Sequence, residues 1–176
     1  MKWVYDDGGR VTAGYKGRAG DCVTRAIAIA TSKLYADVYR ELGCHVAEYA
    51  STHRDRVAKR VHRKGVSVRD GVSRKVYEAY LVTLGWQWTP TMRIGSGCKV
   101  HLHDGELPMG RLIVRLAHHL TAVIDGVIHD TSDPQRETHC VEQGTVRELR
   151  PGEWRNSNGI CWVSRRCVYG YFSEGN

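Results

Sequence analysis

Two segments far apart in the chain carry residues whose types suit nucleophilic catalysis. Cys22 stands at the start of the apolar run 22–30, and His119 and Asp130 stand in the later segment 118–130. A cysteine thiolate can attack a carbonyl carbon, a histidine can take the thiol proton, and an acid can orient the imidazole and stabilise its charged form. These residue types, in the order Cys, His, Asp, therefore predict a triad for hydrolysis or acyl transfer.

The position of Cys22 in its segment predicts an activated thiol. Apolar residues recur at helical spacing over residues 22–31, and we expect this helix to begin near Asp21 or Cys22. The unpaired N–H groups and positive dipole end of a helix N-terminus stabilise a thiolate and lower the thiol pKa. We expect Asp21 to be the N-cap, with its carboxylate accepting from first-turn N–H groups. The alternative is that Cys22 is an ordinary buried cysteine.

The pair Asp125-Gly126 predicts a tight turn between two strands. Both central positions of such a two-residue hairpin turn need positive φ, which Asp and Gly tolerate. On the register that this turn sets, Thr121 faces Asp130, so His119 and Asp130 share one face of the hairpin as diagonal neighbours. We favour His119 with Asp130, because Asp130 lies inside a strand-like segment.

A second histidine and acid remain open as an alternative pair. His118 and Asp133 share the opposite face of the same hairpin, and a register slip of one residue would exchange the two faces. His118 with Asp133 is therefore the alternative catalytic pair.

The remaining elements predict an α+β fold in a single domain, residues 1–176. A short strand is expected over residues 3–5, and strands are expected from residue 86 onward. The expected helices are 22–31, 35–42 with a stop at Gly43, 46–63 with a stop at Gly65, and 74–84 with a stop at Gly85. The later strands are 111–116, the hairpin, 160–163 and 167–172, and residues 133–159 are expected to be rich in loops. The cysteine-bearing helix is expected to pack against the C-terminal antiparallel sheet.

Composition limits the cellular setting and the cofactors that we expect. The chain has 176 residues and six cysteines, and no apolar run is long enough for a membrane span or a signal peptide. We therefore expect a cytoplasmic protein with reduced thiols and no membrane partner. Neither a phosphate-binding loop nor a dinucleotide fingerprint is present. Cys98, His101 and His103 match no common zinc pattern, so we expect no metal and no cofactor.

The formal net charge of +7 is concentrated in one stretch, residues 53–75. Such a stretch indicates either a solvated helix face or a surface for an anionic partner, namely nucleic acid, an acidic protein or a phosphorylated ligand. The expected partner-binding residues are Arg54, Arg56, Lys59, Arg60, Arg63 and Lys64.

The two catalytic segments together resemble the papain-like cysteine peptidase superfamily. The Asp-Cys pair at a helix start is similar to bacteriocin-leader-processing peptidases, and 20–26 resembles the nucleophile motif of ovarian-tumour-type deubiquitinases. The histidine, turn and acid of the hairpin resemble bacterial cell-wall amidases, and the whole pattern resembles small proteins of phage and bacterial genomes. The resemblance implies a papain-like fold with Cys22 as nucleophile, His119 as base and Asp130 as its orienting acid.

The chain departs from these families at two positions before the cysteine. Many papain-like enzymes have an oxyanion-hole glutamine six residues before it, where this chain has Lys16; the deubiquitinase motif has an aspartate three residues before it, where this chain has Ala19. An oxyanion donor is needed for efficient acyl transfer. We expect the backbone N–H of Cys22 to supply one contact and Lys16 or Tyr15 to supply another.

The sequence thus favours a cysteine hydrolase that cleaves an amide or isopeptide bond of a peptide or protein. Acyl transfer to an amine would use the same residues. One alternative is a non-catalytic protein that binds nucleic acid or an acidic partner through the basic stretch. Another is a structural or counter-defence protein of a phage.

Overall fold

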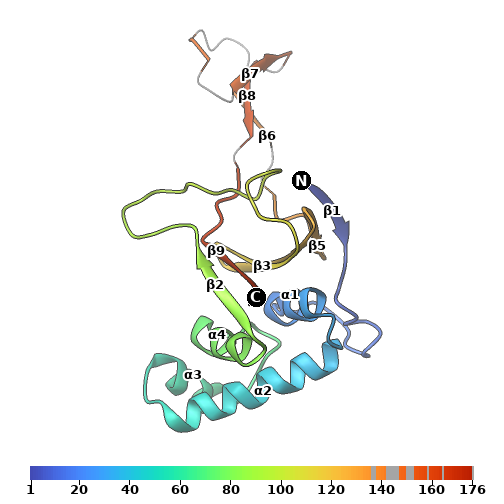
Figure 1. Ribbon diagram of the computed structural model, residues 1–176, viewed down its shortest axis with the longest axis vertical. Helices are drawn as coiled ribbons and strands as arrows, with labels where there is room; N and C mark the ends of the chain where they lie inside the picture. The colour runs from blue at the N-terminus through green and yellow to red at the C-terminus, as the bar shows by residue number, and fades with distance from the viewer. Residues whose placement is uncertain (136–137, 142–146, 150–152, 158, 164, 176) are drawn as a thin grey trace.

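The computed structural model describes residues 1–135, 138–141, 147–149, 153–157, 159–163 and 165–175. Its main body is one sheet with a layer of helices on one side, and a second, small sheet stands apart from this body (Figure 1). The protein is therefore of mixed α+β class, as the order of helical and extended segments predicted.

The main sheet is six-stranded and mostly antiparallel. Its order is β1-β5-β4-β3-β9-β2. The strands are β1 (Lys2–Tyr5), β2 (Trp86–Pro90), β3 (Arg111–Leu116), β4 (His119–Ile124), β5 (Val127–Asp130) and β9 (Gly170–Glu174). Only the edge pair β1–β5 is parallel among the described pairs of this sheet. The order places β4, which carries the candidate histidine, in the middle of the sheet.

The β4–β5 hairpin has the predicted register. Ile124 pairs with Val127, and Ala122 pairs with His129. The turn residues Asp125 and Gly126 both have positive φ, 48° and 77°. The sequence prediction of this hairpin is confirmed, because the local requirement for positive φ fixed the turn and the turn fixed the register.

Helices α1 (Cys22–Thr31), α2 (Tyr35–Thr52), α3 (Arg56–Lys64) and α4 (Arg74–Thr83) form the layer below the sheet in Figure 1. The core between them contains buried residues of α1, α2 and α4 together with Ile113, Ala122 and Phe172 of the sheet. Ala26 and Ala30 are 2% and 0% exposed, so their small side chains let α1 lie close to the strands. The helix that begins at Cys22 is thus fixed against the sheet.

The opposite face of the sheet is buried as well. Leu112, Val114, Leu116, Val123 and Ile128 form a second cluster, which Leu102 and Val168 cover from the flanking loops. Because β3 is buried on both faces, it has the nearly continuous apolar sequence expected of an inner strand.

Two predicted helix limits are wrong. Gly43 does not end a helix but lies inside α2, between the buried residues Leu42 and Val46. Tertiary packing of this face offsets the cost of about 1 kcal/mol for a helical glycine. The break comes later, where Asp55 Oδ1 accepts from the backbone N–H groups of Val57 and Ala58 at 3.0 and 3.1 Å and starts α3. The expected helix 46–63 is therefore the end of α2 followed by α3.

The segment expected to be rich in loops contains two strands. β6 (Thr138–Val141) and β7 (Glu153–Asn156) flank β8 (Gly159–Val163) in a three-stranded sheet, in the order β6-β8-β7. Residues 136–137, 142–146, 150–152 and 158, which include Gly144 and Pro151, lie outside the described part of the chain.

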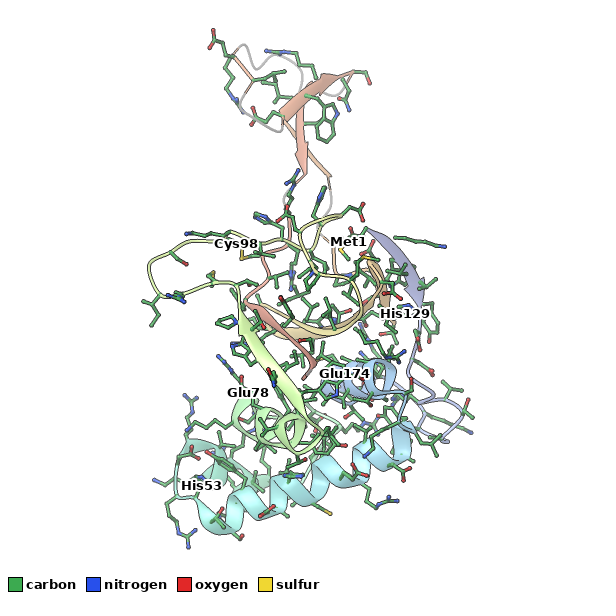
Figure 2. The ribbon with its side chains drawn as sticks, in the orientation of Figure 1. Met1, His53, Glu78, Cys98, His129 and Glu174 are labelled. Carbon is green, nitrogen blue, oxygen red and sulfur yellow. A yellow bond between two sulfur atoms is a disulfide. The ribbon has the colours of Figure 1, made fainter. Side chains whose placement is uncertain are left out.

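The expectation of reduced thiols is wrong for part of the chain. Cys98 and Cys167 form a disulfide with Cα atoms 5.9 Å apart (Figure 2), and Cys161 is also disulfide-bonded. Cys98 therefore does not offer a thiolate to a metal. Cys22 and Cys44 are free. No helix within the described ranges is long and apolar enough to cross a membrane.

Candidate active site

Cys22 is the first residue of α1, as predicted. The residue before it, Asp21, has non-helical φ and ψ of −94° and 28°, and its carbonyl oxygen accepts from the N–H of Arg25. The Cys22 side chain is partly buried and lies beside the His119 side chain and the backbone of Leu120, both of which act on the thiol. A thiol at the open end of a helix therefore meets the first two residues of β4.

The Asp21 side chain does not cap the helix, contrary to expectation. Its carboxylate, only 1% exposed, instead accepts from Arg10 Nε at 2.8 Å, from the Tyr35 hydroxyl and from the Arg25 guanidinium. Two cations and a phenol satisfy a buried carboxylate better than one or two amides do. The side-chain oxygens of Asp21 are thus withdrawn from the first turn of α1.

Arg10 extends this network into the loop that precedes α1. Its guanidinium also donates to the carbonyl oxygens of Tyr15 and Lys16, at 3.0 and 3.3 Å. Since Asp21 is the neighbour of Cys22, the network anchors both the loop and the first turn that presents the thiol. The Arg25–Asp21 spacing of four residues is a sequence feature that could have suggested part of it, whereas nothing local points to Arg10 or Tyr35.

His119 and Asp130 are brought together by the hairpin. His119 Nε2 lies 2.6 Å from Asp130 Oδ2, and the two side chains are 21% and 4% exposed. The other carboxylate oxygen, Oδ1, accepts from the backbone N–H of Thr131 at 2.7 Å. Since Asp130 engages Nε2, the remaining ring nitrogen, Nδ1, is the one left for Cys22. In space, the His119 ring therefore lies between the Cys22 thiol and the Asp130 carboxylate.

The electrostatics of this group favour a charged pair. Burial lowers the pKa of His119, but hydrogen bonds with Asp130 and Cys22 outweigh burial and raise it to about 9. Burial raises the pKa of the Cys22 thiol, but the His119 and Leu120 hydrogen bonds and the charges of His119 and Arg25 bring it below its usual value. Both shifts favour the charged pair, a thiolate beside an imidazolium, over the neutral pair.

The alternative pair is not assembled in this way. His118 lies in the turn between β3 and β4 with φ of 56° and is exposed. The exposed Asp133 accepts hydrogen bonds from the backbone and side-chain nitrogens of Gln135. His118 is in the turn because a two-residue connection between β3 and β4 leaves His119 as the first paired residue.

The two expected oxyanion donors have other contacts. The Tyr15 ring packs against the rings of Tyr35 and Tyr39, with centroids 5.1 and 4.8 Å away. Lys16 is exposed, and its carbonyl oxygen accepts from Arg10. Neither of these contacts involves the Cys22 sulfur.

The basic residues of the expected partner surface are exposed on α3 and the residues before it: Arg54, Arg56, Lys59, Arg60, Arg63 and Lys64. Lys75 from the same stretch is paired with Asp55 at 2.7 Å. In Figure 1, α3 lies at the end of the helical layer away from α1. This charged surface is therefore separate from the Cys22 site.

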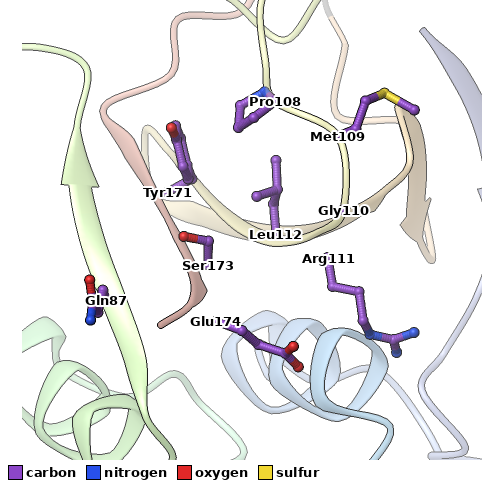
Figure 3. A pocket seen from close by; sticks show the side chains of 9 residues that line it. All are labelled: Gln87, Pro108, Met109, Gly110, Arg111, Leu112, Tyr171, Ser173 and Glu174. Atoms are coloured by element: carbon purple, nitrogen blue, oxygen red, sulfur yellow. The ribbon is translucent and has the colours of Figure 1, made fainter. Parts of the chain in front are cut away.

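A cavity of about 510 Å³ opens between the main sheet and the loop before β3 (Figure 3). The Arg111 guanidinium at the edge of this cavity donates hydrogen bonds to the carbonyl oxygens of Ile29 and Ala30 at the end of α1. Cys22, His119 and Asp130 are absent from its lining, so this cavity is not the place of the proposed chemistry.

Comparison of the chain with models of protein families, with curated proteins and with solved structures found no match.

Proposed function

We propose that this protein is a cysteine hydrolase of papain-like fold that cleaves an amide or isopeptide bond of a peptide or protein. The observation that carries the proposal is the contact series from Cys22 through His119 to Asp130, at the N-terminus of a helix packed on an antiparallel sheet. A structural role alone does not require a partly buried histidine with a raised pKa between a thiol and a carboxylate.

The mechanism follows from the charges of the three groups. The Cys22 thiolate attacks the carbonyl carbon, and the new C–S bond forms as the carbonyl oxygen becomes an oxyanion. The His119 imidazolium then gives its proton to the leaving nitrogen as the C–N bond breaks, which leaves a thioester. Neutral His119 next takes a proton from water, and the hydroxide attacks the thioester carbon. The C–S bond then breaks, which releases the carboxylic acid product and regenerates the Cys22 thiolate beside protonated His119. Asp130 keeps Nε2–H oriented and stabilises the charged ring in both halves. Attack by an amine in place of water gives acyl transfer.

The start of α1 supplies the oxyanion contact in this proposal. Because the Asp21 carboxylate is engaged by Arg10, Arg25 and Tyr35, it does not accept from the first-turn amides. The backbone N–H of Cys22 therefore stays open to the developing negative charge, in the positive field of the helix end.

The pH dependence of alkylation tests the proposal. Iodoacetamide labelling is followed by mass spectrometry for Cys22, with the free, exposed Cys44 as internal reference in the same sample. We expect Cys22 to react with an apparent pKa well below about 8.5, and His119→Ala to return it toward that value. Identical profiles for Cys22 in wild type and His119→Ala would contradict the thiolate–imidazolium pair and with it the hydrolase.

A second candidate function is binding of an acidic partner or nucleic acid through α3. It is favoured by the exposed basic residues of that helix. Under it, Cys22→Ser retains function, whereas neutralising Arg60 and Arg63 weakens binding and its dependence on salt.

A further inference from the structure

A second cavity of about 510 Å³ lies at the β2–β9–β3 edge of the helical face. It is lined by residues of α4, β2, β3 and the loops after β2 and before β9. We call it the arginine pocket and define it by Arg74, Trp88, Met92, Arg93, Arg115 and Tyr169. It differs in charge from the cavity of Figure 3, because three arginines line it, whereas Arg111 and Glu174 line the other cavity.

The aromatic wall of the arginine pocket is built against the sheet. Trp88 packs on Phe172, with ring centroids 4.8 Å apart, and crosses the backbone of Gly170. Gly170 has φ of 151°, and a Cβ atom there would lie 2.3 Å from Trp88 Cζ2. Only glycine leaves room for the indole at this place, so the position of the ring is set by the strand itself.

The guanidinium groups of the pocket are not neutralised equally. Arg74 pairs with Glu78 and lies over the Trp88 ring, 5.2 Å from its centroid. Arg115 lies over Tyr169 at 5.5 Å, and no ion pair of Arg93 or Arg115 with an acidic side chain occurs within the described ranges. Positive charge without an acidic partner, next to flat aromatic surface, suits a carboxylate carried on an apolar stem.

The arginine pocket adjoins the Cys22 site through β3 and β4. Arg115 pairs across the strands with Leu120, and paired residues of neighbouring strands point to the same face. Leu120 is the residue whose backbone lies beside the Cys22 thiol and helps to lower its pKa. Burial raises the pKa of Tyr77 to about 12, and the charges of Arg115 and Cys22 also act on its hydroxyl. Tyr77 is therefore within electrostatic range of both the pocket and the thiol.

We infer that the arginine pocket recognises an acidic residue of the peptide or protein substrate, close to the bond that Cys22 attacks. The inference rests on the proposed function and names its substrate class. Arg93 and Arg115 bind the carboxylate, and the Trp88 and Tyr169 rings cover the methylene groups of the same side chain. The residues are specificity determinants rather than catalytic residues, because they contact the substrate away from the reacting carbonyl.

Binding of two matched peptides tests the inference. The probes are fluorescein-labelled hexaglutamate and hexaglutamine, followed by fluorescence anisotropy with the Cys22→Ser protein, which cannot consume them. We expect hexaglutamate to bind and hexaglutamine to bind more weakly. Arg93→Gln with Arg115→Gln should weaken hexaglutamate binding by about tenfold or more, since removing charge-assisted hydrogen bonds costs that much.

A matched control separates the pocket from general charge. Arg60→Gln with Arg63→Gln on α3 gives the same net charge and leaves the arginine pocket intact, so hexaglutamate affinity should change by less than about twofold. Equal losses in both double variants would overturn the inference, because they would show attraction by net charge alone. The variant Arg93→Lys with Arg115→Lys keeps both positive charges and should retain most of the hexaglutamate binding. Circular dichroism checks that the variant is folded.

Two further experiments test which class of ligand the pocket binds and whether the pocket lies beside Cys22. Oligothymidylate of the same charge should compete less well than unlabelled hexaglutamate for the labelled probe. Stronger competition by the oligonucleotide would overturn the acidic-peptide assignment in favour of nucleic acid.

In the wild-type protein, hexaglutamate should slow iodoacetamide labelling of Cys22 but not of Cys44. Binding without protection would contradict a pocket beside the thiol. An unreactive Cys22 would remove the hydrolase proposal alone, and the anisotropy results would still decide what the pocket binds.

Discussion

The Nε2 atom of His119 lies 2.6 Å from Oδ2 of Asp130, which leaves Nδ1 of the same ring for the Cys22 thiol. The imidazole thus bridges a buried carboxylate and a sulfur atom at a helix N-terminus. A carboxylate on one side stabilises the positive ring, and the positive ring stabilises the thiolate on the other side. The reactivity of Cys22 therefore depends on Asp130, although the two residues have no direct contact in this arrangement.

The first prediction concerns Asp130→Asn. Loss of the carboxylate should lower the pKa of His119 and raise that of Cys22, and catalysis should fall by about 10²–10⁴-fold, the usual contribution of acid–base catalysis. The alkylation profile of Cys22 and the NMR titration of the His119 ring measure the two shifts. Asp133→Asn, at the exposed acid of the alternative pair, is the control and should change neither. The reverse ranking of these two variants would make Asp133 the functional acid.

The hairpin that carries His119 and Asp130 was predictable because its determinants are local. Asp125-Gly126 sets a turn of positive φ, and the turn sets the register that places both residues on one face. The start of α1 at Cys22 was predictable for the same reason, from the apolar spacing of the following residues.

The surroundings of the site were not predictable, because they come from long-range contacts. Arg10 reaches Asp21 from an irregular loop, and Tyr35 reaches it from the next helix. The arginine pocket depends on β9 lying between β3 and β2, an order that no local pattern specifies. The Cys98–Cys167 disulfide likewise joins segments that only the folded sheet brings together.

The second prediction is a pH dependence of stability. The folded pKa of His119 is raised above the unfolded value of 6.5, so its contribution is complete below pH 6.5 and is lost as the pH rises toward 9. The depressed pKa of Cys22 acts in the opposite direction, so Cys22→Ser is used to isolate the histidine. In this variant the unfolding free energy should fall by on the order of 1–2 kcal/mol between pH 6 and pH 9.

Urea denaturation at several pH values measures this effect. Cys22→Ser with His119→Gln is the reference, because it removes the titrating ring and keeps a polar side chain. The difference between the two proteins should shrink with rising pH. A difference that is constant, or that grows, contradicts a raised pKa for His119.

The third prediction concerns the network below Cys22. Asp21→Asn leaves the guanidinium groups of Arg10 and Arg25 without their buried carboxylate, which should cost about 3–5 kcal/mol of unfolding free energy. Asp37→Asn removes the partner of an exposed pair with Arg40 and should cost less than about 1 kcal/mol. Chemical denaturation compares them, and similar small losses would show that the Asp21 network does not stabilise the start of α1.

The fourth prediction concerns Gly170→Ala. The new methyl group meets the Trp88 ring and the Thr89 carbonyl oxygen at 2.3 and 2.6 Å, so strand and indole cannot both keep their places. We expect a loss of about 1–3 kcal/mol and a changed near-ultraviolet circular dichroism of the tryptophans. Gly105→Ala is the matched control: Gly105 also has positive φ, 76°, its Cβ would meet nothing within 4 Å, and it does not line the arginine pocket. Hexaglutamate binding should fall in Gly170→Ala and not in Gly105→Ala.

The fifth prediction concerns the Cys98–Cys167 disulfide. It closes a loop with a sequence separation of 69, and the Cys167 sulfur lies 3.8 Å from the sulfur of Met92 in the arginine pocket. Cys98→Ser with Cys167→Ser should therefore lower the unfolding free energy by about 2–4 kcal/mol. The wall formed by the loop after β2 should lose its anchor at the same time, so hexaglutamate affinity should fall. Cys22 is outside this loop and its alkylation profile should stay as in wild type. If the double variant is destabilised but its hexaglutamate affinity is unchanged, Met92 and Arg93 are held in place without the disulfide. If the alkylation profile of Cys22 shifts, the pocket and the thiol site do not form independently.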